Sequence, residues 1–177
     1  NWDGSELPIS GIKFEIYNAN FNKLLGKTAL DGGWGVAYVP ADVQKVVVKV
    51  DLKAVSKKYI FDTEEKTVFI TDGGNIETSF IARKLYNIVG NVAFKGFDKE
   101  ELEKLRRKVY ITLGKHKIQV GGNNKYYLEG VEAGKYQLTL HGIPSNMLSK
   151  ESLLSIAVEV GGMSANIGLP ELQAIMR

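Results

Sequence analysis

Histidines and pairs of adjacent glutamates are the residues in this sequence whose chemistry could support catalysis. His116 and His141 are well separated, and neither lies in a metal-binding spacing such as His-Glu-x-x-His. The glutamate pairs at 64–65 and 100–101 fall in charged segments, where solvation accounts for them without acid–base chemistry. The sequence contains no nucleophile elbow, phosphate-binding loop or dinucleotide fingerprint. We therefore expect a protein that is not an enzyme.

The composition is that of a globular protein with a mixed surface charge. Of the 177 residues, 44% are hydrophobic and 24% are charged, and the formal net charge is +3. The basic cluster 106–108 follows an acidic stretch at 98–101, and this mixture does not favour nucleic-acid binding. The absence of cysteine excludes disulfides and thiolate metal sites. The apolar runs are too short for a membrane span.

Apolar and polar side chains alternate in several segments, as they do in strands that bury one face. The alternation is clear at residues 12–17, 109–113 and 136–141. Segments rich in Gly and Asn, such as 18–22 and 121–124, separate these runs and suit hairpin turns. This pattern predicts an all-β fold built from antiparallel β-sandwiches.

One short helix is predicted at about 98–107. Asp98 can cap its first turn, with Glu101 placed three residues later to complete a capping box. Leu102 and Leu105 form a short apolar stripe, and the basic residues that follow suit the carboxyl end of a helix.

The sequence contains an internal repeat. Residues 67–89 align without a gap with residues 155–177, so that two Gly-Gly pairs superimpose. Upstream, three positions of one copy match three of the other: Trp34, Val36 and Val39 match Tyr126, Leu128 and Val131. Self-similarity of this kind predicts tandem structural modules.

We place the first module at residues 1–85 and the second, which contains the helix, at 86–169. Residues 170–177 correspond to the start of the second module, so we expect them to lead into a following module. The modules join without a Pro- or Ser-rich linker. The first strand of the first module is expected to be missing, because NWDGSELP resembles the middle of a longer protein.

The run Tyr126, Leu128, Val131, Gly134 and Tyr136 resembles the characteristic spacing of prealbumin-like or transthyretin-like modules of bacterial surface proteins. Residues 88–94 are similar to the first strand of that family, Ile-x-Gly-x-Val. The first module keeps the first three positions but has residues 42–46 in place of Gly-x-Tyr. The family includes carboxypeptidase regulatory-like domains, SdrD B-like repeats, collagen-adhesin B-type domains and modules of usher-type outer-membrane proteins.

The resemblance implies one candidate metal site. Family members carry an acidic loop before a strand, and Asn1, Asp3 and Glu6 would be its remnant, with oxygen donors that suit calcium. The alternative is a plain solvated turn, and no other cofactor is expected. Some collagen-adhesin relatives carry a lysine-to-asparagine crosslink, but Lys13 alternates with core positions and should face solvent.

Aromatic side chains could form a different kind of site, because rings on a sheet surface can stack on sugars. Trp34 and Tyr126 occupy matching positions and are predicted to pack in the core of their modules. Trp2 and Tyr127 are the stronger candidates for exposed rings.

These observations and the resemblance favour a non-catalytic structural or spacer repeat of a bacterial cell-envelope or surface protein, located at the cell surface, outside the cell or in the periplasm. Its expected partners are neighbouring modules of the same chain, other envelope or surface proteins, or glycan, but not nucleic acid. The alternative is a glycan- or protein-binding, adhesin-like module, which a surface cluster of rings would favour. A third alternative, an enzyme or its accessory domain, would require a deep polar pocket around either histidine.

Overall fold

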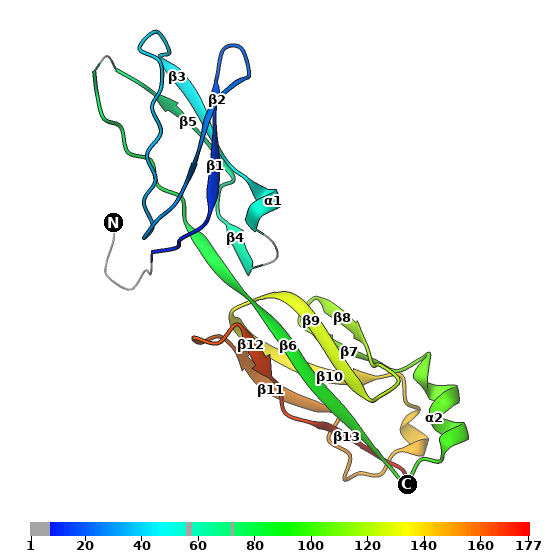
Figure 1. Ribbon diagram of the computed structural model, residues 1–177. Coiled ribbons are helices and arrows are strands. Elements are labelled where there is room, and N and C mark those ends of the chain that lie inside the picture. The colour runs from blue at the N-terminus through cyan, green and yellow to red at the C-terminus, as the bar shows by residue number, and fades with distance from the viewer. Residues whose placement is uncertain (1–7, 56–57, 72) are drawn as a thin grey trace. The chain divides into compact units, whose positions relative to one another are not determined.

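The computed structural model describes residues 8–55, 58–71 and 73–177 (Figure 1). The chain separates into two compact units, Asn1–Arg83 and Lys84–Arg177. Strands dominate both units, so the predicted all-β fold is confirmed. The division at 85 and 86 that the repeat suggested stays a prediction about module boundaries.

The first unit is built on a four-stranded antiparallel sheet of order β2-β1-β3-β5. Its strands are β1 (Lys13–Asn18), β2 (Lys23–Ala29), β3 (Lys45–Val50) and β5 (Glu65–Phe69). A one-turn helix, α1 (Leu52–Val55), and a short strand, β4 (Tyr59–Phe61), connect β3 to β5.

The alternation in β1 places its apolar side chains on one buried face. Ile12 and Phe14 pack in one cluster with Val50, and Ile16 packs in a second cluster with Val46. Lys13 is exposed, as the alternation predicted. This buried face of the sheet is therefore the side on which the rest of the first unit packs.

The second unit is a β-sandwich with a sheet on each side of one core. One sheet has the order β11-β10-β7-β8, and the other is built around the long strand β6. The bounds are β6 (Ala82–Lys95), β7 (Tyr110–Leu113), β8 (His116–Gln119), β9 (Lys125–Glu132), β10 (Gly134–His141), β11 (Ser155–Val160), β12 (Asn166–Gly168) and β13 (Leu172–Ile175), with a 3-10 turn at Ser145–Met147.

Strand β6 pairs with several other strands. It pairs antiparallel with β9 and parallel with both β12 and β13. The parallel pairings differ from the antiparallel ones that the sequence predicted, because the chain returns after β11 along the other side of β6. An alternating pattern reports which face a side chain takes but not the direction of the partner strand.

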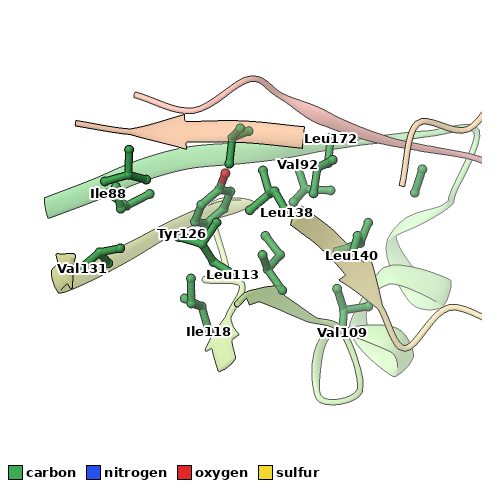
Figure 2. Packing of buried hydrophobic residues seen from close by; sticks show 14 of the residues in the cluster. Ile88, Val92, Val109, Leu113, Ile118, Tyr126, Val131, Leu138, Leu140 and Leu172 are labelled. Atoms are coloured by element: carbon green, nitrogen blue, oxygen red, sulfur yellow. The ribbon is translucent and has the colours of Figure 1, made fainter. Parts of the chain in front are cut away.

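Both sheets of the second unit contribute to a core that Figure 2 shows at close range. Ile88, Ile111, Leu138 and Leu172 have no exposed surface, and they come from β6, β7, β10 and β13. Burial of each such side chain contributes about 1.5–3 kcal/mol, so this core is the main source of stability in the unit.

The predicted helix is present as α2 (Lys99–Arg106). The Asp98 carboxylate accepts from the N–H of Glu101 at 2.8 Å, and the Glu101 carboxylate accepts from the N–H of Asp98 at 3.0 Å. This is the capping box that the sequence predicted. Leu105 is buried and anchors the helix to the core.

Residues 170–177, expected to lead into a following module, include β13. Leu172 and Ala174 have no exposed surface and pack in the core of the second unit. These residues therefore complete the second unit, and their continuation into another module stays a prediction.

Candidate interaction surface

Two segments of the first unit expose large apolar side chains. In residues 34–39, Trp34 is 69% exposed, Val36 72% and Tyr38 92%. In residues 76–81, Ile76 is 43% exposed and Ile81 57%. We call these five side chains the open face. Large exposed apolar side chains on a folded unit can mark a place where another molecule binds.

Both segments cross the same buried face of the first sheet. Val39, from one segment, packs against the cluster that contains Ile16. Phe80, from the other segment, packs against Phe14 with 4.9 Å between the ring centroids. Because Phe14 and Ile16 lie on the same face of β1, the two segments form one incomplete second layer.

The backbones of these segments lack strand pairing. Among the described residues, no backbone–backbone hydrogen bond involves residues 35–39 or 75–80. Neither segment is a strand. Apart from the Ser79 carbonyl, which accepts from Lys66 Nζ, their peptide groups can therefore accept a further strand.

The matching segments of the second unit are paired and buried. Residues 125–132 form β9 and residues 166–168 form β12, and both strands pair with β6. Tyr126 is only 3% exposed and Val131 is fully buried. Strand β6 thus covers Tyr126 in the second unit, whereas the matching Trp34 of the first unit stays exposed.

The prediction that Trp34 packs in a core is therefore wrong, and the same prediction for Tyr126 is confirmed. The two residues match in sequence, but only Tyr126 has a neighbouring strand to cover it. No residue near Trp34 signalled its exposure, because the repeat gives Trp34 and Tyr126 the same sequence context.

The remaining aromatic predictions are resolved in part. Tyr127 is 51% exposed, as predicted, and its hydroxyl donates to Glu129 at 3.0 Å. Tyr136 is partly buried, and its hydroxyl donates to the carbonyl of Glu132 at 2.8 Å. Trp2 lies outside the described residues.

The two histidines lie on opposite faces of the β7 sheet, because His141 pairs with Tyr110 whereas His116 pairs with the buried Leu113. His141 Nε2 is 2.9 Å from the Thr112 hydroxyl, and its ring stacks on Tyr110 with 5.0 Å between centroids. His116 begins β8 next to the hairpin turn and pairs with Leu113. Packing against neighbouring side chains accounts for His141, and a turn position accounts for His116.

A small recess lies under α2 in the second unit. Apolar side chains, among them Phe94, Leu102 and Val109, form most of its lining, with Arg106 at its edge. It has room for about one water molecule, which is too small for an organic ligand.

A cluster of three interacting polar side chains lies on β1 and β2. The Tyr17 hydroxyl donates to the Glu15 carboxylate, and Lys27 Nζ lies 3.2 Å from the same group. The bond from Tyr17, followed by that from Lys27, lowers the pKa of Glu15, and the bond to Glu15 raises the pKa of Tyr17. The three side chains satisfy one another, so the pKa shifts of Glu15 and Tyr17 need no bound ligand.

The candidate calcium ligands Asn1, Asp3 and Glu6 lie outside the described residues, so their site is untested. Among residues 8–55, 58–71 and 73–177, no group of three or more His, Asp or Glu side chains could hold a metal ion. In the same part of the chain, none of the helices has the length and apolar character needed to cross a membrane.

No family model and no curated protein matches the sequence. Among solved structures, the chain is similar to a streptococcal ancillary pilin at 11% identity and a TM-score of 0.40, over 96% of this chain and 59% of that one. It is similar to the Bacillus anthracis TIE protein at 15% identity and a TM-score of 0.40, over 99% of this chain and 32% of that one. It is also similar to GBS52, the minor pilin of Streptococcus agalactiae, at 9% identity and a TM-score of 0.35, over 97% of this chain and 86% of that one. The chain thus spans less than two thirds of the first two structures.

Proposed function

We propose that the chain is a non-catalytic structural repeat that acts as a spacer in a bacterial cell-envelope or surface protein of the prealbumin-like type. The observation that supports this function best is strand β6, which begins at Ala82 in the first unit and ends at Lys95 in the second. Just before β6 begins, the carbonyl of Ile81 accepts from the N–H of Asp62 at 3.0 Å. A single strand therefore leaves one unit and becomes the central strand of the next.

An array built in this way would start each module on the strand that closes the one before it. Strand β13 supports this arrangement, because residues 172–175 match residues 84–87 in the repeat. Neighbouring modules of the same chain are therefore the partners we propose. Since a regular strand rather than a Gly- or Pro-rich linker joins the units, we expect the connection to resist bending.

Distance measurements between spin labels test the spacer function. The chain has no cysteine, so Asn20→Cys and Met163→Cys place one label on an exposed position of each unit. Lys115→Cys with Met163→Cys gives a control pair inside the second unit. A spacer predicts a single distance distribution between the units that is nearly as narrow as the control. A much broader distribution between the units contradicts a spacer.

The exposed rings of the open face favour a second candidate, a glycan- or protein-binding, adhesin-like module. Trp34 and Tyr38 are the exposed rings that would stack on a sugar. Oligosaccharide titrations of the Trp2→Phe variant, followed by Trp34 fluorescence, test the glycan form of this function. A saturable change that Tyr38→Ala abolishes would support it, and no change with any sugar would leave the spacer function as the better account.

We also propose, from the family resemblance, that Asn1, Asp3 and Glu6 bind calcium. Carboxylate and amide oxygens near a Gly turn are suitable ligands for this ion. Calorimetric titration of calcium into the full chain and into Asp3→Ala tests the site. Binding heat that is lost in the variant supports the site, and equal heats in both proteins refute it.

A further inference from the structure

Among the described residues of the first unit, no strand takes the position that β6 has in the second. In the second unit, β6 lies between β9 on one side and β12 and β13 on the other. The first unit contains the matching segments, residues 34–39 and 76–81, but no described strand pairs with them. We propose that the open face binds an extended peptide strand from outside the 177 residues, which carries an apolar residue, any residue and then a glycine.

The pairing in the second unit supplies the register of this strand. Ile88 pairs with Leu128, and Gly90 pairs with Tyr126. Leu128 and Tyr126 match Val36 and Trp34 of the first unit. The bound strand therefore places an apolar side chain opposite Val36, and two residues later it places glycine opposite Trp34.

The glycine is required because an aromatic ring occupies the space beside it. Figure 2 shows the Tyr126 ring directed from β9 toward β6, with its hydroxyl at the backbone of that strand. A Cβ atom at Gly90 would lie 2.2 Å from the Tyr126 Oη and 2.3 Å from its Cζ, far inside van der Waals contact. The indole of Trp34 is larger than this ring, so a strand beside it has the same requirement.

Strand addition is the binding mode that uses both features of this surface. The peptide groups of residues 35–39 and 75–78, which have no backbone partner among the described residues, can form the backbone hydrogen bonds of a sheet. The exposed side chains of Trp34 and Val36 can then bury their apolar area under the added strand. Backbone pairing supplies affinity, and the apolar-x-glycine pattern supplies specificity.

A second copy of the chain does not offer residues 88–90 as a free strand. Several of its segments have an apolar residue, any residue and then glycine, but the one with this register, 88–90, lies within β6. In each copy, β6 is already paired with β9, β12 and β13. Binding of a second copy through another such segment would appear as self-association, which the test below measures.

A synthetic peptide with the sequence of residues 87–95, NIVGNVAFK, is a direct probe of this proposal. The acceptor is the full chain with Trp2→Phe, so that Trp34 is its single tryptophan. Titration calorimetry measures binding, and tryptophan emission measures burial of the indole. We expect saturable 1:1 binding and a shift of the Trp34 emission maximum to shorter wavelength.

Matched variants separate strand addition from unspecific adhesion. In the peptide, Gly90→Val should weaken binding about tenfold or more by overpacking. Val89→Thr changes a side chain that faces solvent in β6, so this peptide should bind as tightly as the unmodified one. In the acceptor, Val36→Asp should abolish binding. Phe21→Asp, which changes an exposed side chain of the β1–β2 turn, should not.

A second arm covers a peptide that binds too weakly when free. The same nine residues fused to the amino terminus through a flexible linker act at millimolar effective concentration. A Trp34 emission shift in this fusion that is absent from the Gly90→Val fusion supports the proposal. No shift in either arm, or equal shifts with both peptides, overturns it. Self-association of the unmodified chain that Val36→Asp abolishes also overturns it, because the open face would then join two copies.

Discussion

The contact between Gly90 and Tyr126 gives the sharpest test of the packing of β6. Gly90→Ala would place a Cβ 2.2 Å from the Tyr126 Oη, and the ring is only 3% exposed and cannot move into solvent without leaving the core. Overpacking of this kind costs about 1–3 kcal/mol, and we take the upper end because three ring atoms lie within 2.8 Å. Replacement of a strand glycine by alanine returns about 0.5–1 kcal/mol through the unfolded state. The net loss is about 2 kcal/mol in the stability of the second unit.

Urea unfolding of the full chain, followed through NMR cross-peaks of residues 84–177, measures this loss. Tyr126→Leu removes the ring atoms that meet the new Cβ, so in that background Gly90→Ala should cost less than about 0.5 kcal/mol. Gly168→Ala in β12 is the control, because no atom lies within 4 Å of its Cβ position. It should stabilise the unit by about 0.5–1 kcal/mol, the gain expected for a strand glycine whose Cβ meets no other atom. An equal cost of Gly90→Ala with tyrosine or leucine at 126 would refute the reasoning.

Four further predictions concern the second unit. The buried Tyr126 hydroxyl has no hydrogen-bond partner among the described residues, so Tyr126→Phe should stabilise the unit by about 1 kcal/mol. Burial raises the pKa of Tyr126 from 10.0 to about 12. Its neutral form therefore favours folding below pH 10, and this contribution to stability is lost as the pH rises toward 12. In urea melts at increasing pH, Tyr126→Phe should lose less stability over this range than the unmodified chain. Asp98→Ala removes the cap from the Glu101 N–H and should cost about 1 kcal/mol in the same melts, with no change contradicting the cap. Leu138→Ala in the core should lower the free energy of unfolding by about 2–5 kcal/mol. Met163→Ala, at a side chain that is 94% exposed, should leave it unchanged. Equal effects of the two variants would contradict the burial of Leu138.

Local patterns in the sequence predicted the parts of the fold that depend on local physics. The alternation at residues 12–17 predicted which side chains of β1 are buried, because successive side chains of a strand point to opposite faces. The spacing of Asp98 and Glu101 predicted the start of α2, because a capping box needs only four consecutive residues.

Features that depend on distant strands were not predictable in the same way. Trp34 and Tyr126 have the same sequence context, but their burial differs because β6 covers only Tyr126. The parallel direction of β12 and β13 depends on the path of the chain after β11, which alternation does not encode.

The candidate site was predictable only in outline. The repeat pointed to Trp34 and Val36 as matching positions of Tyr126 and Leu128, but it assigned Trp34 to a core. Their role as an open face follows from the unpaired backbone beside them, which no residue type signals. The calcium ligands proposed at the amino terminus rest on the family resemblance and stay a prediction.

The central claim is that the second unit contains a strand, β6, whose position no described strand fills in the first. Amide hydrogen exchange measured by NMR on the full chain tests this claim most directly. We predict that the amides of residues 35–39 exchange at close to the rate of an unfolded chain, because they have no backbone partner among the described residues. The amides of β9 that pair with β6 should be protected to nearly the full stability of the second unit. Equal protection of the two segments would contradict the account, because it would mean that the strand position of the first unit is already filled.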